Sequence, residues 1–353
     1  MTREIRVRDV TIGGGAPVVV QSMCNTRTTD VEATVAQIAR LEHAGCEIAR
    51  VAVPDMPAAR ALPAILERIS IPLVADIHFD HRLALAAVDA GVDKLRLNPG
   101  NITDPAKIED VARAAADAGI PIRVGANSGS LAPDYTDEHG HATARGLVDS
   151  AMNEIQLLEK IGFEEIVVSL KATDVRMTIE ANREIARERD YPLHIGVTEA
   201  GTPREGSIRS AIGLGVLLAE GIGDTIRVSL AGDPVEEMRV AYEILRSLGL
   251  RQRGIDLHAC PTCGRTRIDL ASIAEGVRAE LEDIVDPLRL ALMGCIVNGL
   301  GEVRDADVGL VGGDGVGSIY VDGKLASAEI PEEQLVRETI RCVRERLEKD
   351  GGT

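Results

Sequence analysis

Short apolar runs and longer amphipathic stretches alternate along the first two thirds of the chain. The apolar runs are rich in β-branched residues. The stretches between them, such as 31–45 and 106–119, are rich in alanine and space their apolar positions as a helix does. Several stretches end on a glycine where a helix C-cap is expected. The apolar runs are 17–22, 47–53, 72–77, 94–98, 121–126, 165–170, 192–197 and 224–230.

This alternation predicts a parallel sheet surrounded by helices. The runs are mostly apolar, which is typical of parallel strands that are covered on both faces. Eight successive strand–helix units in about 250 residues fit a closed (β/α)8 barrel of the TIM type. An open doubly wound sheet is the structural alternative. We favour the barrel because there are eight units and no glycine-rich dinucleotide loop follows the first run.

The pattern changes after residue 251. The second part predicts a small α+β domain, with the chain divided into 1–251, the barrel, and 252–353, the smaller domain. The expected segments of the smaller domain are a helix at 269–283, an apolar run at 288–293, a glycine-rich loop at 294–301, a hairpin at 316–326 and a closing helix at 331–349.

Polar side chains gather where the predicted barrel strands end, which is where TIM barrels bind ligands. Four arginines and one lysine among them indicate a pocket for a small polyanion, most simply a diphosphate. The alternative is internal ion pairing of the arginines with Asp76, Glu199 or Glu47. Glu199 and His78 are candidate proton donors. The strand-end residues are Arg50, Asp76, His78, Arg96, Asn98, Arg123, Asn127, Lys171, Glu199, Arg227 and Ser229.

Composition limits the classes of partner. The chain has 353 residues, with 39 Lys and Arg against 56 Asp and Glu, and a formal charge of −17, which argues against nucleic acid and anionic membranes as partners. Two Phe, four Tyr and no Trp leave little aromatic surface for base stacking. The chain start lacks a signal-peptide core, and the most apolar stretch, 211–220, is too short to span a bilayer. We therefore expect a cytoplasmic protein.

Three of the six cysteines indicate a metal site. Cys260 and Cys263 form a C-x2-C pair, and Cys295 follows in a glycine-rich segment. The remaining three, Cys24, Cys46 and Cys342, are expected to be small core residues. A zinc site that recruits His258 and an iron–sulfur cluster that takes an oxygen ligand such as Glu302 both remain open at this point.

The segments ACPTCGRT (259–266) and MGCIVNGLGE (293–302) closely resemble the bacterial 4-hydroxy-3-methylbut-2-enyl diphosphate synthase family of the methylerythritol phosphate route to isoprenoids. Ala259 and Leu300 are less typical of that family, but neither supplies a ligand. The resemblance extends over the whole chain in the expected order, through QSMCNT (21–26), RVAVPD (50–55), ADIHFD (75–80), LRLNPGN (95–101), RVGANSGSL (123–131), VSLKA (168–172), HIGVTEAG (194–201) and RVSL (227–230).

This resemblance implies a barrel followed by a small iron–sulfur domain in which Cys260, Cys263, Cys295 and Glu302 hold a [4Fe–4S] cluster. It implies an oxidoreductase that opens 2-C-methyl-D-erythritol 2,4-cyclodiphosphate with two electrons from flavodoxin or ferredoxin. It also implies a head-to-tail homodimer in which the cluster of one subunit closes over the barrel of the other. We assign Glu199 as the proton donor. The expected substrate ligands are Arg50, Arg96, Asn98, Arg123, Asn127, Lys171 and Ser229.

If the family resemblance is set aside, the residues themselves leave two other functions open. One is a non-redox barrel enzyme, a phosphoester lyase or pterin-type transferase, with a structural zinc. The other is a non-catalytic binding module stapled by a metal. Iron and sulfide analysis separates the first rival from an iron–sulfur enzyme, and the cations gathered at one barrel end argue against the second.

Overall fold

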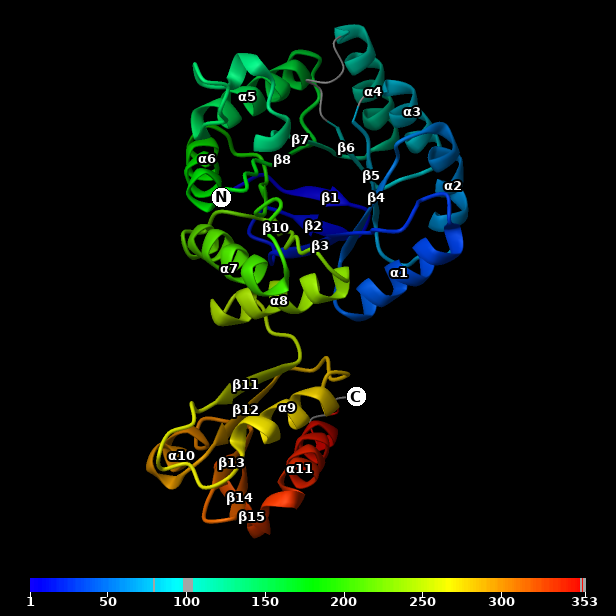
Figure 1. Cartoon of the computed structure of the whole chain (residues 1–353). Coiled ribbons are helices and arrows are strands. Elements are labelled where there is room, and N and C mark those ends of the chain that lie inside the picture. The colour runs from blue at the N-terminus through cyan, green and yellow to red at the C-terminus, as the bar shows by residue number, and fades with distance from the viewer. Residues whose placement is uncertain (79, 98–103, 350, 352–353) are drawn as a thin grey trace. The chain divides into compact units, whose positions relative to one another are not determined.

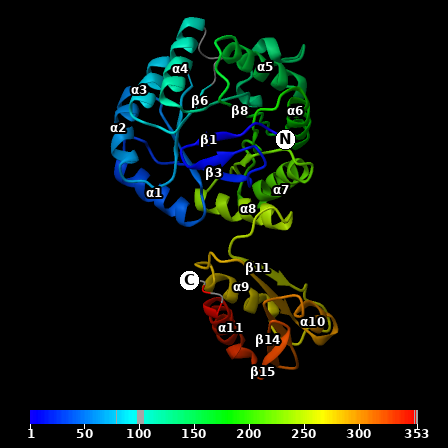
Figure 2. The same cartoon turned by 180° about the vertical axis from the view of Figure 1, so that it is seen from behind.

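The computed structural model describes residues 1–78, 80–97, 104–349 and 351. The chain divides into two compact units, Met1–Arg251 and Gln252–Thr353, and each is considered separately. Figures 1 and 2 show the elements of both units from opposite sides. Among the described helices, none has the length and apolar character that a membrane crossing requires.

The first unit is built around eight parallel strands. Their order in the sheet is β8-β7-β6-β5-β4-β3-β10-β9, and a parallel bridge between Val168 and Leu193 joins the two ends of this order. The predicted TIM-type barrel is thereby confirmed. The strands are β3 (Val19–Met23), β4 (Ile48–Ala52), β5 (Leu73–Asp76), β6 (Lys94–Arg96), β7 (Ile122–Val124), β8 (Ile166–Val168), β9 (His194–Ile195) and β10 (Thr225–Ile226).

A helix follows each barrel strand, and Figure 1 shows these helices forming the outer ring. Aspartates start most of them, because the Asp side chain accepts a hydrogen bond from an otherwise unpaired N–H of the first turn; Asp30 and Asp174 do so for α1 and α6. The helices are α1 (Val31–His43), α2 (Met56–Leu66), α3 (His81–Asp89), α4 (Pro105–Ala118), α5 (Ala144–Lys160), α6 (Val175–Glu188), α7 (Pro203–Ala219) and α8 (Pro234–Ser247).

An N-terminal hairpin, which the sequence pattern did not predict, closes one end of the barrel. Its strands β1 (Ile5–Val7) and β2 (Val10–Ile12) are antiparallel. Val7 and Ile12 are fully buried against Val19, Ile48 and Val74, near the amino ends of the barrel strands. This plug leaves the opposite end, where the strands finish, as the end available to a ligand.

The second unit contains a five-stranded sheet in the order β11 (Ile255–Ala259), β12 (Leu288–Met293), β13 (Val308–Gly312), β14 (Val316–Val321) and β15 (Lys324–Pro331). The first three strands run parallel, and the last two add antiparallel pairs. Helices α9 (Leu270–Glu280) and α11 (Leu335–Lys349) share one apolar core with alternate residues of the central strands, such as Leu290 and Leu310. The predicted hairpin is confirmed, with Asp322 and Gly323 both at positive φ in its turn.

The prediction of a glycine-rich loop at 294–301 is wrong, because most of this segment forms the short helix α10 (Ile296–Glu302). α10 covers the other face of the sheet, where Met293 and Val311 form a second small core with Val303. Gly299 is needed there for close packing, since a Cβ atom would lie 2.7 Å from the Val311 side chain. The glycines of this segment therefore allow a helix to approach the sheet rather than interrupt it.

Candidate functional site

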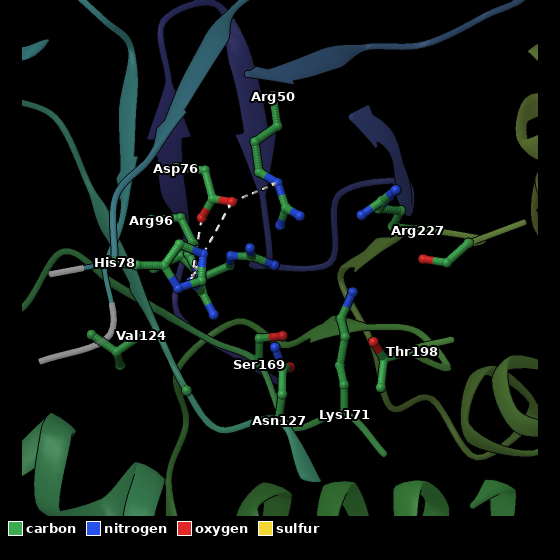
Figure 3. Close-up of a pocket in the computed structure, with 13 residues that line it drawn as sticks. Arg50, Asp76, His78, Arg96, Val124, Asn127, Ser169, Lys171, Thr198 and Arg227 are labelled. Atoms are coloured by element: carbon green, nitrogen blue, oxygen red, sulfur yellow. Dashed lines mark hydrogen bonds and ion pairs between the residues drawn. The ribbon is translucent and has the colours of Figure 1, made fainter. Parts of the chain in front are cut away.

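A pocket lies at the carboxyl ends of the barrel strands, and we call this end the barrel mouth (Figure 3). Six of the expected substrate ligands line it: Arg50, Arg96, Arg123, Asn127, Lys171 and Ser229. Asn98 lies outside the described residues. Other side chains also line the pocket, namely Asp76, His78, Ser169, Thr198 and Arg227. Arg227 belongs with the predicted cationic strand ends, although the expected ligand set did not include it.

Asp76 at the end of β5 pairs with two of the arginines. Its carboxylate oxygens lie 3.3 Å from Nη1 of Arg96 and 3.9 Å from Nε of Arg50, and His78 Nε2 is 3.5 Å away. Figure 3 shows these contacts. Burial alone would raise the pKa of Asp76, but Arg50, His78 and Arg96 hold it well below its usual range. The structural alternative of internal ion pairing therefore accounts for part of the charge, and Asp76 is ionised at neutral pH.

Arg50 and Arg227 meet at the sulfur of Met23 on β3. The Nε and Nη2 atoms of Arg50 lie 3.1 and 2.7 Å from Met23 Sδ, and Nη1 of Arg227 lies 3.6 Å from it. Arg227 also pairs with Glu237 of α8 at 3.6 Å, and Glu237 accepts a hydrogen bond from Ser22 Oγ at 3.0 Å. No strand-end pattern signals Glu237, because it reaches the barrel from a helix.

Arg123 and Lys171 form no ion pair with a carboxylate among the described residues, although the charge of Asp76 acts on Arg123 from a distance. Arg123 is 3% exposed, and its Nε and Nη1 atoms have no hydrogen-bond partner in the described parts of the chain. Lys171 Nζ lies 3.1 Å from Nε2 of His194, and that ring also contacts Thr225 Oγ1 at 2.6 Å through Nδ1. Gly196 leaves the room that Lys171 requires, since a Cβ there would lie 2.9 Å from Nζ.

The mouth therefore holds more positive than negative charge. Five cationic side chains line the pocket, and in the described residues the carboxylates that pair with them are Asp76 and Glu237. Buried, unpaired guanidinium N–H groups are costly unless a ligand satisfies them. Arginine binds phosphate oxygens with two parallel hydrogen bonds. A small ligand with more than one phosphate charge is the chemistry that this pocket favours.

Glu199 lies beside the pocket rather than in its lining. It directly follows Thr198, its backbone has a φ of 51°, and its carboxylate accepts a hydrogen bond from Thr173 Oγ1 at 2.9 Å. A left-handed backbone is unfavourable for glutamate, and such positions cluster at functional sites. The side chain is exposed at the mouth, where a carboxyl group can exchange protons with both solvent and a bound ligand.

The candidate iron ligands lie at one end of the second sheet. Cys260 directly follows β11, and Cys295 lies two residues after Met293, the last residue of the paired strand β12. Gly294 N, between them, donates to Cys260 Sγ at 3.3 Å. The segment after Cys260 packs on the same glycine, since Arg267 N donates to Gly294 O at 3.4 Å. Cys263, within this segment, is exposed, and a backbone hydrogen bond from Arg265 lowers its thiol pKa.

These residues suit an iron–sulfur cluster in their chemistry. Three thiols lie on neighbouring loops, and Glu302 ends the helix that Cys295 begins, about 10 Å away along the axis. Among the described residues no three His, Cys, Asp or Glu side chains form a ready-made metal site. His258 contacts Asp256 at 2.9 Å. As expected, Cys24, Cys46 and Cys342 are buried.

A TIM barrel with a cationic mouth, followed by an α+β domain with three loop cysteines, is the class of protein that these observations define. The chain matches the family model of the GcpE TIM-barrel domain over residues 2–242 and that of the GcpE protein C-terminal domain over 256–345. It belongs to the GcpE family.

The curated relatives support this assignment at high identity. The chain is 54% identical over 337 residues to a protein of Geobacillus thermodenitrificans, covering 96% of this chain and 90% of the relative. It is 54% identical over 334 residues to one of Geobacter sulfurreducens, covering 95% and 94%. Both relatives are named 4-hydroxy-3-methylbut-2-en-1-yl diphosphate synthase (flavodoxin). The family resemblance and the oxidoreductase class expected from the sequence are thereby confirmed.

Solved structures share the barrel at low identity. The dihydropteroate synthase of Yersinia pestis aligns with a TM-score of 0.50 and 15% identity, covering 69% of this chain and 98% of that one. The 7,8-dihydropteroate synthase of Vibrio fischeri aligns with the same TM-score and 14% identity, covering 70% and 98%. At this identity the likeness concerns the fold alone.

Proposed function

We propose that this chain catalyses the reductive ring opening and dehydration of 2-C-methyl-D-erythritol 2,4-cyclodiphosphate to 4-hydroxy-3-methylbut-2-enyl diphosphate, a step of isoprenoid biosynthesis. The observation that carries the proposal is the surplus of buried cations around Arg123, whose Nε and Nη1 atoms have no hydrogen-bond partner among the described residues. A compact substrate with two phosphates offsets this surplus, whereas the net charge of −17 repels larger polyanions. The name of the GcpE-family relatives supports the same reaction.

The barrel mouth binds and orients the two phosphates. Arg123 and Lys171 supply N–H groups that no carboxylate in the described part of the chain binds, while Asp76 keeps Arg50 and Arg96 in fixed positions. Asn127 and Ser229 add uncharged hydrogen-bonding groups, and Arg227 joins the set from the end of β10. We include Asn98 among the substrate ligands because it follows Arg96 by two residues.

The reaction consumes two electrons and a proton. A carbon–oxygen bond to one phosphate of the cyclic dianion breaks, a hydroxyl group leaves as water, and a carbon–carbon double bond forms. The product is an open diphosphate with one more negative charge than the substrate. Glu199 donates the proton to the departing hydroxyl oxygen, since its carboxyl group lies at the mouth and regains a proton from solvent.

Cys260, Cys263, Cys295 and Glu302 are the residues that would hold a [4Fe–4S] cluster. Such a cluster supplies the two electrons one at a time. Reduced flavodoxin is the donor that the name of the relatives indicates, and ferredoxin is the alternative. The thiol ligands match iron in softness, and the N–H group of Gly294 that points to Cys260 Sγ would tune the potential.

We also propose a head-to-tail homodimer in which each barrel works with the cysteine domain of the other subunit. Ile296, Val297 and Leu300 on α10 are exposed beside Cys295, an apolar surface that another subunit would cover. Mixing a Lys171→Ala variant with a Cys295→Ser variant tests this arrangement. In a head-to-tail dimer the mixed pair contains one complete site, so activity returns on mixing. Continued inactivity of a pair that co-purification of two differently tagged variants shows to be mixed would refute it.

Anaerobic purification followed by a reduction assay tests the reaction itself. The protein is expected to contain iron and acid-labile sulfide and to convert the cyclodiphosphate when reduced flavodoxin is supplied. One zinc without sulfide, together with no conversion, would favour the non-redox barrel enzyme instead. A dihydropteroate synthase assay on the same sample serves as the control for the shared barrel fold.

A further inference from the structure

Lys94 is a buried lysine that the reaction described above does not use. It lies on β6, two residues before Arg96 and so on the same face of the strand, and it is 0% exposed. Its Nζ has no hydrogen-bond partner among the residues that the structure describes. Its partner in register on β5 is Val74, which belongs to the apolar plug of the N-terminal hairpin. Lys94 therefore occupies the layer between this plug and the cationic mouth.

The charged groups around Lys94 are mostly of its own sign. Arg50 and Arg123 are close enough to lower its pKa, which burial lowers most, to about 7. Asp76, two residues beyond Val74 and so on the same face of β5, is a strand carboxylate that already pairs with Arg50 and Arg96. The other charged or titratable groups of the barrel interior include Lys171, the imidazole of His194, whose pKa the charge of Lys94 also lowers, and Arg227 with its partner Glu237.

Burial and the neighbouring arginines lower the pKa of both lysines in the barrel interior, that of Lys171 well below its usual range, but the two amines differ in their contacts. Arginine does not release its proton in proteins. Lys171 reaches the pocket and has the His194 nitrogen as an acceptor. In the described parts of the chain Lys94 has neither access to the pocket lining nor an acceptor. A bound dianion at the mouth would reverse this balance, because it attracts positive charge through a region from which water is largely excluded.

We propose that Lys94 is a proton-linked counterion of the bound diphosphate: its amine is neutral in the free barrel and takes up one proton from solvent when the ligand binds. The proposal rests on the proposed function, since it assumes that the mouth binds a diphosphate. The amine gains a proton and no other bond changes. Lys94 acts through charge rather than contact with the substrate, and its positive charge also favours the product, which carries one more negative charge.

Titration calorimetry in buffers of different ionisation enthalpy measures this proton directly. The oxidised holoenzyme is titrated with the cyclodiphosphate without an electron donor, so that no turnover occurs. Each phosphate of this ligand has one strongly acidic hydroxyl group and does not titrate near neutrality, so any proton taken up goes to the protein. We expect uptake approaching one proton per site at pH about 8, fading below pH about 6, and an affinity that falls up to about tenfold per pH unit above neutrality.

A Lys94→Met variant is expected to lose this uptake and to bind the ligand with a flatter pH dependence. Lys160→Met is the matched control, because Lys160 is exposed at the end of α5, and it should keep the wild-type uptake. Lys94→Gln provides a second variant if the first fails to fold. Binding without proton uptake in the wild type, or uptake that persists in both Lys94 variants, would overturn the inference. No binding at all would instead contradict the proposed function.

Discussion

Lys171 and His194 form a buried pair in the barrel, with 3.1 Å between Nζ of the lysine and Nε2 of the imidazole. Burial, and next to it the charge of Lys171, hold the pKa of His194 well below its usual range, so the ring is neutral at pH 7. A neutral ring that accepts at Nε2 carries its proton on Nδ1, which lies 2.6 Å from Thr225 Oγ1. His194 is therefore a positioning residue for Lys171.

The first prediction concerns this pair. His194→Leu removes the acceptor and should raise KM for the cyclodiphosphate about tenfold, because Lys171 then loses a hydrogen bond that directs it. His194→Gln retains an acceptor oxygen and should recover part of the loss. Steady-state kinetics under anaerobic conditions measure both, with cluster content as the control. Equal KM values for wild type and His194→Leu would contradict the role.

Removal of the Arg123 guanidinium should weaken substrate binding more than it disturbs the fold. Charged hydrogen bonds contribute about 1.5–3 kcal/mol each, so Arg123→Met should raise the dissociation constant roughly 10–100-fold. Nε and Nη1 of Arg123 bond to no group among the described residues, so removing these two atoms breaks no hydrogen bond within that part of the fold. Calorimetric titration with the substrate measures the effect, and an unchanged isotherm would remove Arg123 from the binding site.

Glu199→Gln should separate binding from turnover. The amide retains the size of the side chain but cannot donate the proton to the departing hydroxyl, so kcat should fall about 10²–10⁴-fold. Substrate affinity and iron content should stay close to wild type, since Glu199 does not line the pocket. Glu205→Gln is the matched control, because Glu205 is an exposed glutamate in the first turn of α7, close to Glu199 in the sequence. Full activity of Glu199→Gln would assign the proton to another group.

Asp76 should stabilise the barrel at neutral pH. Its folded-state pKa is depressed, so its contribution is complete above the ordinary carboxyl pKa and is lost as the pH falls through the folded value. Asp76→Asn leaves Arg50 and Arg96 without a counterion and should cost about 3–5 kcal/mol at pH 7. The difference from wild type should shrink as the pH falls below about 3.8. Denaturant unfolding at several pH values measures it, and a difference that is constant with pH would refute the assignment.

The period-two pattern of strands explains why so much of the mouth was predictable. Residues two apart in a strand share a face, so the sequence places Asp76 with His78, and Arg96 with Lys94, on one face of their strands. In the structure Asp76 and Arg96 are direct partners in the register of β5 with β6. Hydrophobic runs likewise predicted all eight barrel strands. These features depend on local sequence, which a single chain displays directly.

Other features depend on contacts between distant segments and left no local pattern. Glu237 reaches Arg227 from α8. Val7 and Ile12 of the N-terminal hairpin pack against residues near the amino ends of the barrel strands. The helix α10 forms because Gly299 can approach Val311, although glycine is a poor helix former by itself. The sequence shows only that Lys94 shares a strand face with Arg96. The lack of a hydrogen-bond partner for Lys94 among the described residues depends on distant segments, so only the structure reveals it.

The last prediction is that Lys94→Met stabilises the free barrel. The folded-state pKa of Lys94 is about 7, against 10.5 for an unperturbed lysine, so the unfolded chain binds more protons between these pH values. Wild-type stability should therefore rise with pH in this window, by up to about 1.4 kcal/mol per unit. The Lys94→Met variant has no amine that must lose its proton or be buried with its charge. Its free energy of unfolding should therefore exceed that of the wild type by about 2–4 kcal/mol at pH 7, and the difference should decline towards pH 10. Urea unfolding of the barrel at pH 7 and pH 9 measures it, with Lys160→Met expected to match wild type at both. An advantage that is absent at pH 7, or one that grows with pH, would mean that Lys94 keeps its proton in the free barrel.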